Sequence, residues 1–132
     1  MSSAVNEFLA AIQARLAGDV GLADVIGAGG MRDRRANGLD LPALVLSAVE
    51  SRDYSTASEA GVEILLTLEA WSAEGRREAE VIAETVRSLL EDAALAPAGH
   101  ALVSLRHRRT VSRREAKTGF FVAELVFRAV VE

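Results

Sequence analysis

The residues best suited to chemistry in this sequence form a basic run toward its C-terminal end. Its six cations lie within twelve positions that hold a single carboxylate, Glu115; they are Arg106, Arg108, Arg109, Arg113, Arg114 and Lys117. A surface of this kind can contact phosphates or an acidic protein surface. No aromatic ring interrupts the run, so a platform that stacks the bases of single-stranded nucleic acid is not indicated.

The same run predicts an arm. In an extended strand, alternation places Arg106 and Arg108 on one face and His107 and Arg109 on the other, so the charge wraps around the segment. Because the run cannot neutralise itself, we expect it to project from the fold, to be mobile in the free protein and to become ordered against another subunit, another protein or DNA. A solvated hairpin without a partner is the alternative.

Patterns that would support catalysis or metal binding are weak. The glycines of residues 27–30 suggest a phosphate loop, but Arg32 stands where a dinucleotide fingerprint needs its third glycine, and no Walker sequence is present. His100 and His107 are an odd number of positions apart, so they point to opposite faces of a strand. The chain has no cysteine and no Gly-x-Ser-x-Gly elbow. We expect no enzyme activity, no metal and no cofactor.

Composition predicts a single domain over residues 1–132. Half of the residues are hydrophobic and 26% are charged, which supports a packed core and argues against a disordered chain. The absence of cysteine favours synthesis in a cytosol. No secretory signal is indicated at the N-terminus, and no apolar stretch approaches the roughly 20 residues of a membrane span.

The net charge of −4 conceals an uneven distribution along the chain. Residues 1–100 contain eight arginines and sixteen acidic residues, whereas residues 101–132 contain seven cations and three glutamates. An acidic body with a basic C-terminal quarter suggests head-to-tail complementarity between copies, or an acidic partner for that quarter. Two ordinary solvated surfaces are an equally acceptable explanation.

Apolar spacing predicts an amphipathic helix near the N-terminus, with Val5, Phe8, Leu9, Ile12 and Leu16 on one face. Ser2 or Ser3 can cap its start, and Gly18 stops it because glycine tolerates a left-handed conformation. A short turn over residues 21–26 follows. Residues 27–42 lack apolar periodicity, so we expect a long loop that is the least ordered part of the chain.

Four strands and a second helix are predicted beyond this loop. Residues 43–49 form a strand, which a polar connection, residues 50–58, joins to a period-two strand at residues 61–71. Helical spacing returns from about residue 76 to residue 92, with Ala79, Ile82, Ala83, Val86, Leu89 and Leu90 on one face. Strands at residues 101–111 and 119–131 are joined by the polar residues 112–118.

These elements predict an α+β fold, in which a mostly antiparallel four-stranded sheet is covered on one face by two amphipathic helices. The order is helix, strand, strand, helix, strand, strand. The other sheet face is then half apolar, which commonly marks an interface with another chain. Its apolar members would be Leu65, Trp71, Val103, Leu105, Val122 and Val126. The long loop folding over this face is the alternative.

Short segments over most of the chain, from about residue 5 to residue 130, carry a resemblance to a known family. They are Pro42-Ala43-Leu44-Val45, Ser51-Arg52-Asp53-Tyr54-Ser55-Thr56, Gly61-Val62-Glu63, Leu66-Thr67-Leu68, Trp71-Ser72 with Gly75, Glu78-Ala79, Gly99-His100, Leu105-Arg106 and Phe127-Arg128-Ala129. In these segments the chain resembles the tail terminator or tail-completion proteins of long-tailed bacteriophages, which also occur in prophages and gene transfer agents.

The resemblance implies a structural virion protein that assembles in the bacterial cytoplasm. It implies a sixfold ring at the head-proximal end of the tail tube, which stops polymerisation of the tube and presents the surface where head and tail join. The implied partners are further copies of the chain, the major tail tube protein, a head-completion protein and the DNA that passes through the lumen of the ring.

The candidate interface or DNA-facing residues are the six cations of the basic run together with Trp71, Arg52, Asp53 and Tyr54. Trp71 ends the most regular strand on the face away from Val62, Ile64 and Leu66, where its ring can act as a packing anchor. A small nucleic-acid-binding or regulatory module that uses residues 106–117 is the second hypothesis. A small-molecule-binding α+β domain is the third.

Overall fold

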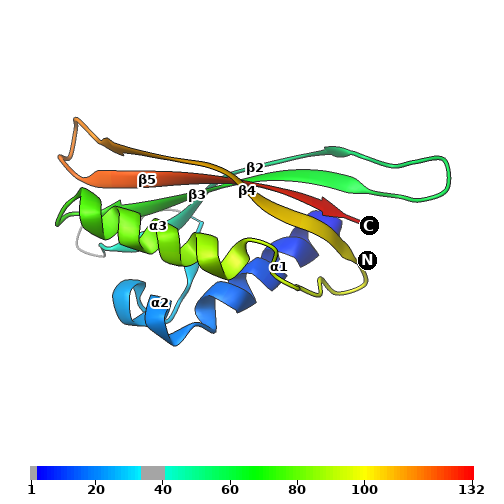
Figure 1. The fold of residues 1–132 in the computed structure, drawn as a ribbon, viewed down its shortest axis with the longest axis horizontal. Helices are drawn as coiled ribbons and strands as arrows, with labels where there is room; N and C mark the ends of the chain where they lie inside the picture. The colour runs from blue at the N-terminus through cyan, green and yellow to red at the C-terminus, as the bar shows by residue number, and fades with distance from the viewer. Residues whose placement is uncertain (1–2, 34–40) are drawn as a thin grey trace.

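The computed structural model describes residues 3–33 and 41–132, which contain three helices and five strands (Figure 1). They are α1 (Ala4–Ala17), α2 (Val20–Ile26), β1 (Met31–Arg32), β2 (Ala43–Asp53), β3 (Val62–Ser72), α3 (Arg76–Leu90), β4 (Leu102–Arg114) and β5 (Phe121–Val131). The predicted α+β class is confirmed, but the predicted count of two helices and four strands is wrong, because the short turn expected over residues 21–26 is the helix α2 and β1 was not foreseen.

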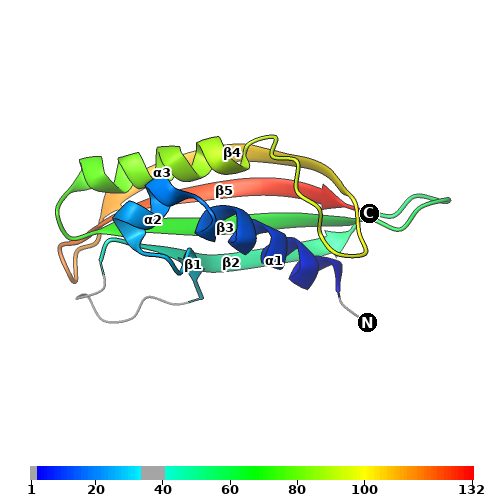
Figure 2. The same ribbon diagram turned by 90° about the horizontal axis from the view of Figure 1, so that it is seen from below.

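The strands form one sheet in the order β1-β2-β3-β5-β4. Neighbouring strands are antiparallel except β1, which pairs in parallel with β2. All three helices cover the same face of the sheet, and within residues 3–33 and 41–132 no helix lies over the other face (Figures 1 and 2). We call these the helix face and the open face. No helix in the described part of the chain combines the length and the apolar character that a membrane span requires.

Alternation along the two central strands decides which side chains enter the core. The inward residues of β3 and β5 are almost fully buried; they include Ile64, Leu66, Leu68, Ala70, Ala123, Leu125, Phe127, Ala129 and Val131. They form one cluster with the apolar faces of α1 and α3, which contribute Phe8, Ile12, Leu16, Ala79, Ile82, Val86 and Leu90. The period-two and helical patterns predicted for these elements are therefore confirmed, and burial of this apolar surface stabilises the fold.

Helix α1 begins and ends where the sequence predicts, but the reason for glycine at its C-terminal end differs from the predicted one. The Ser3 hydroxyl oxygen accepts a hydrogen bond from the Asn6 backbone N–H at 3.0 Å and so caps the helix. Gly18 has a φ of −80°, so it does not use the left-handed conformation that we expected. A Cβ at Gly18 would lie 3.0 Å from the Ala14 carbonyl oxygen, and this close approach favours glycine.

Part of the predicted long loop forms defined structure against α1. The Gln13 amide nitrogen donates to the carbonyls of Gly29 at 2.7 Å and Met31 at 3.2 Å, and its amide oxygen accepts from the Met31 N–H at 3.0 Å. Gly30 has a φ of +63°, and a Cβ there would lie 2.7 Å from the Gln13 amide oxygen, so the contact requires glycine. Residues 34–40 of the predicted loop lie outside the described residues.

Strand β4 corrects the predicted composition of the open face. Its register against β5 shifts by one residue between Leu102 and Ser104, so Val103 is an extra residue. Leu105 consequently pairs with Ala129 on the helix face and is 1% exposed, although we expected it on the open face. A single inserted residue reverses the faces of all residues that follow it in a strand.

Truncating a core valine of α3 should destabilise the protein far more than truncating a solvent-facing one. Val86 is 0% exposed and Val81 is 59% exposed on the same helix. Val86→Ala removes two buried methyl groups and leaves a cavity, so the free energy of unfolding should fall by about 2 kcal/mol. Val81→Ala should change it by less than about 0.5 kcal/mol. Chemical denaturation measures both values, and equal losses would contradict the packing of α3 through Val86.

Candidate functional site

The basic run lies on β4, an edge strand of the sheet. Strand β4 pairs with β5 as far as Arg114, so the run from Arg106 to Arg114 belongs to the sheet. A closed turn follows, in which the Glu115 N–H donates to the Phe120 carbonyl and the Gly119 N–H donates to the Glu115 carbonyl, both at 2.8 Å. The expected projecting arm is therefore wrong for this part of the run, because strand pairing continues through its polar residues.

A β-bulge changes the face on which the cations lie. The register against β5 shifts between His107 and Arg109, so Arg108 is an extra residue. Arg106 and Arg109 therefore share the open face, while the His107 ring packs edge-on against Phe127 of the core at 5.5 Å. The predicted grouping of Arg106 with Arg108, and of His107 with Arg109, is wrong because alternation does not continue across a bulge.

Carboxylates of the central strands neutralise two cations of the run on the open face. The Arg113 guanidinium lies 3.8 Å from the carboxylates of Glu69 on β3 and Glu124 on β5. Arg109 lies 4.0 Å from Glu124. These side chains are partly exposed, so each pair stabilises the monomer by less than about 1 kcal/mol. Their main effect is to reduce the net charge of this part of the open face.

The remaining cations of the run divide into one paired residue and three unpaired ones. Arg106 lies 3.6 Å from the Asp92 carboxylate and 3.8 Å from that of Glu91, both beyond the end of α3. Arg108, Arg114 and Lys117 are exposed and form no ion pair within residues 3–33 and 41–132. The charge available to a partner is therefore concentrated at the bulge and in the turn between β4 and β5.

A second group of charges joins three strands at the other end of the open face. The Glu63 carboxylate of β3 accepts hydrogen bonds from Arg52 of β2 at 2.5 Å and from Arg128 of β5 at 2.6 Å. Glu63 is 8% exposed, and its hydrogen bonds with Arg52 and then Arg128 lower its pKa. The Arg128 guanidinium also lies 5.4 Å from the centre of the Tyr54 ring. We call these four residues the arginine clamp.

Past the Arg52–Glu63 pair of the clamp, β2 and β3 end in a hairpin. This hairpin extends beyond the body of the fold (Figures 1 and 2). We call residues 53–61 the β2–β3 tip. Its turn is closed by the Asp53 carboxylate, which accepts from the Ser55 N–H at 3.1 Å and from the Ser55 hydroxyl at 2.6 Å. The Gly61 N–H donates to the Ser55 hydroxyl oxygen at 3.0 Å. The hydrogen bonds from Ser55 also lower the pKa of Asp53.

Arg52, Asp53 and Tyr54 therefore lie together, at the junction of the clamp and the tip. The sequence predicted a polar connection over residues 50–58, whereas β2 continues through Asp53. The signal for a defined turn was present, because an Asp followed two residues later by Ser commonly closes a turn through side-chain hydrogen bonds.

Trp71 forms a small second core on the open face, away from the main cluster. It is 6% exposed and packs with Val45 and Val122, which are also buried, and with the partly buried Leu41 and Phe120. The Trp71 indole N–H donates to the Glu69 carboxylate at 3.1 Å. The predicted face of Trp71 is confirmed, and its ring is a packing group rather than an exposed contact.

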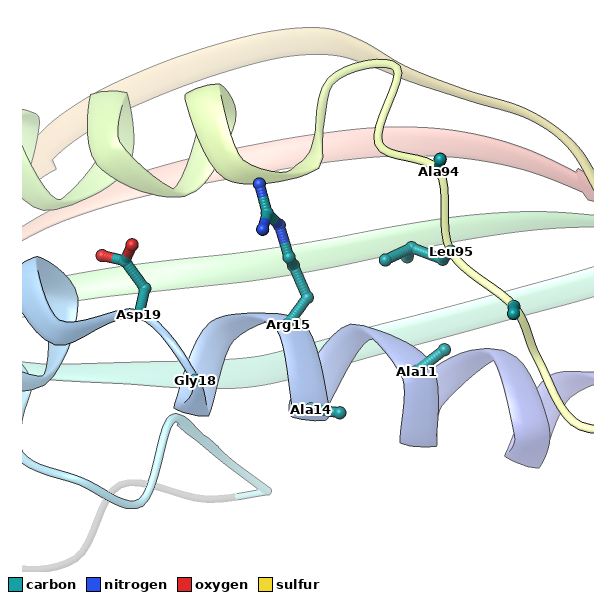
Figure 3. Close-up of a pocket in the computed structure, with 8 residues that line it drawn as sticks. Ala11, Ala14, Arg15, Gly18, Asp19, Ala94 and Leu95 are labelled. Carbon is teal, nitrogen blue, oxygen red and sulfur yellow. The ribbon is translucent and has the colours of Figure 1, made fainter.

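A shallow pocket of about 450 Å³ lies beside α1 (Figure 3). Small residues dominate its lining, which comprises Ala11, Ala14, Arg15, Gly18, Asp19, Ala94, Leu95 and Ala96. Its charged side chains serve the fold: Arg15 donates to the Leu89 carbonyl at 3.0 Å, and Asp19 accepts from the Leu22 N–H at 2.8 Å to cap α2. Figure 3 shows Arg15 of α1 reaching toward the end of α3, so this side chain links the two helices beside the pocket.

The histidines do not converge on a common site. The His107 ring nitrogen Nε2 lies 2.7 Å from the Thr110 hydroxyl on β4, whereas His100 lies outside that strand, in the turn after Pro97. Within the described ranges, no group of three or more His, Cys, Asp or Glu could hold a metal ion.

Comparisons with known proteins point to one family. The model of the family described as "Tail completion protein gp17" matches residues 10–132. Among solved structures, a chain of the "Virion of native gene transfer agent (GTA) particle" is similar, with a TM-score of 0.88 and 26% sequence identity. The similarity covers 100% of this chain and 99% of that chain. No curated protein matches the sequence significantly.

Acidification should weaken the arginine clamp through Glu63. Because hydrogen bonds hold its folded-state pKa below the ordinary value of 4.5, the stabilisation is complete above that pH and is lost as the pH falls through the lowered pKa. Glu63→Gln keeps the shape but not the charge, so its free energy of unfolding should change less than that of the wild type between about pH 5 and about pH 2. Urea denaturation across this range measures the difference, and identical pH profiles would contradict the role of Glu63.

Trp71→Ala should lower the free energy of unfolding by roughly 3 kcal/mol, because the ring is buried in the second core. Val111→Ala is the matched control, since Val111 is 44% exposed on the same face. Thermal or urea denaturation of both variants measures the effect. Trp71 is the only tryptophan, so its fluorescence should also be blue-shifted in the native wild type. A stable Trp71→Ala variant with solvent-like native fluorescence in the wild type would disprove the burial.

Proposed function

Because this chain belongs to the family of tail completion proteins, we propose that it forms the ring that ends a phage-like tail. In this proposal, copies of the chain assemble as a sixfold ring at the head-proximal end of the tail tube, terminate its polymerisation and provide the surface that joins head and tail. The observation that carries the proposal is the family match over residues 10–132, which includes every strand of the sheet.

The similar chain supports a place in the virion. That chain is part of a gene transfer agent particle, and its similarity extends over the whole fold described here. A structural role, as opposed to catalysis, is the function that the family supports. The proposed partners are further copies of this chain, the major tail tube protein, a head-completion protein and DNA passing through the lumen.

The asymmetry of the fold supports a closed ring. Ring formation requires a head-to-tail contact between two different surfaces of the same chain, with a rotation that closes. The helix face and the open face differ in composition, and the sheet ends in two hairpins of unlike charge. A chain with two unlike ends can also present one surface to the tube and another to the head.

The nucleic-acid module that uses residues 106–117 is less well supported. Arg106, Arg109 and Arg113 already face carboxylates of the same chain. Phosphate binding gains its strength from releasing counterions of free cations, and paired cations contribute less to it. DNA in the lumen of the ring remains part of the proposal, because Arg108, Arg114 and Lys117 are exposed.

Deletion of the gene in the cell that produces the particle tests the proposed function. We expect tail tubes of uncontrolled length and heads without tails, because nothing then stops the tube or joins it to the head. Expression of the wild-type chain from a plasmid should restore joined particles with tails of uniform length. Electron microscopy measures tail length and attachment. Tails of normal length joined to heads in the deletion strain would overturn the proposal.

A further inference from the structure

The β2–β3 tip is exposed along almost its whole length. Residues 51–60 are all exposed, and the tip extends beyond the point where β3 leaves β5 (Figures 1 and 2). Its charged side chains are Asp53 and Glu59, and residues 53–61 contain no lysine or arginine. A hairpin that buries so little apolar surface adds little to the stability of the monomer. This favours a role for the tip in a contact outside the chain.

The same tip is nevertheless held in a defined shape. Within the turn, the Thr56 N–H donates to the Glu59 carbonyl at 2.8 Å, and the Glu59 N–H donates to the Thr56 hydroxyl oxygen at 3.1 Å. The arginine clamp anchors its base across β2, β3 and β5. A hairpin that is ordered before it binds loses less entropy on association, so the defined shape of this tip favours docking.

The opposite end of the sheet carries a hairpin of the opposite charge. We call residues 113–120 the β4–β5 tip; its charged residues are Arg113, Arg114, Glu115 and Lys117. The Glu115 carboxylate accepts a hydrogen bond from the Thr118 hydroxyl at 2.8 Å and so serves the turn itself. Arg114 and Lys117 are exposed and unpaired among the described residues. This tip therefore presents a net positive charge to a neighbour.

The register of the central strands fixes the two tips at opposite ends of the molecule. Val62 pairs with Val131 at the end that carries the β2–β3 tip, and Ser72 pairs with Phe121 at the other end. Figures 1 and 2 both show the green β2–β3 tip and the orange β4–β5 tip at the two ends of the long axis. One copy cannot bring its own tips together, but two neighbouring copies can.

We propose that the β2–β3 tip of one copy docks onto the β4–β5 tip of the next copy. The contact joins Glu59 of one chain to Arg114 and Lys117 of its neighbour, and it is head-to-tail because the two surfaces differ. The proposal rests on the proposed ring and names the contact that closes it. Several exposed pairs act together here, since a single exposed pair is weak.

Cross-linking tests the contact directly, because the chain has no cysteine of its own. Ser58→Cys and Ala116→Cys place one thiol on each tip at exposed positions. Particles carrying both substitutions in one chain are purified and treated with a short bismaleimide, whose reach tolerates offsets that a disulfide would not. We expect a ladder of covalent oligomers in denaturing gels. The matched control combines Ser58→Cys with Ser88→Cys, which is exposed on α3, and should give no ladder.

Each other outcome overturns the inference. Dimers from Ser58→Cys alone would show that two β2–β3 tips meet. A cross-link from Ser58→Cys to the tail tube protein would show that the tube is the partner. Joined particles with tails of uniform length but no ladder would reject this contact and leave the ring proposal intact, whereas the deletion strain tests the ring by itself.

A charge exchange provides a second measurement. Lys117→Glu should lower the yield of joined particles by at least about tenfold, because it places like charges opposite each other. Adding Glu59→Lys in the same chain should restore most of the yield, since the pair is then reversed. Both positions are exposed, so purified variants should melt like the wild type. A normal yield for Lys117→Glu, or no restoration by the double variant, would count against the contact.

Discussion

The pairing of β3 with β5 is the interaction on which the rest of the structure depends. Residues 62–72 and 121–131 pair in continuous register, whereas the pairings of β2 and β4 contain register shifts. This register directs one row of side chains into the helices and the other onto the open face. A slip of either strand by one residue would turn its own charged side chains into the apolar core, Glu63 and Glu69 on β3 or Glu124 and Arg128 on β5, at the large cost of burying charges away from water. The register thus fixes the core and the charged surface together.

On the open face, the arginine clamp fixes the relative positions of β2, β3 and β5 more than it raises the free energy of unfolding. Removing a carboxylate such as Glu63 from water carries a desolvation cost, which its hydrogen bonds from Arg52 and Arg128 largely offset. The net gain in stability is therefore small, but the two short hydrogen bonds tie β2, β3 and β5 at one point. The clamp lies close to the point where the sheet narrows to β2 and β3, at the base of the β2–β3 tip.

Charges that are paired within the chain and charges that remain unpaired lie in different parts of the sheet. Along the middle of the open face, Arg109 and Arg113 face carboxylates of the same chain, so little net charge is left there. At the ends of the sheet, Glu59 of one tip and Arg114 and Lys117 of the other are exposed and of unlike sign. In the proposed ring, contact between the two tips would use charge that the monomer leaves unpaired, while the helix face packs the core.

The sequence by itself determined the helices and strands in which buried residues recur at a regular spacing. It predicted α1, α3, the inward rows of β3 and β5 and the position of Trp71, since each follows a regular alternation against one core. Tertiary structure alone decided the rest: β1 exchanges hydrogen bonds with Gln13 of α1 and pairs with β2, and the polar end of β2 is a strand because β3 pairs with it. The basic run was recognised, but its faces were not, because a bulge at Arg108 inserts a residue that no composition or period reveals. Such features arise from contacts between distant segments, so local sequence patterns do not predict them.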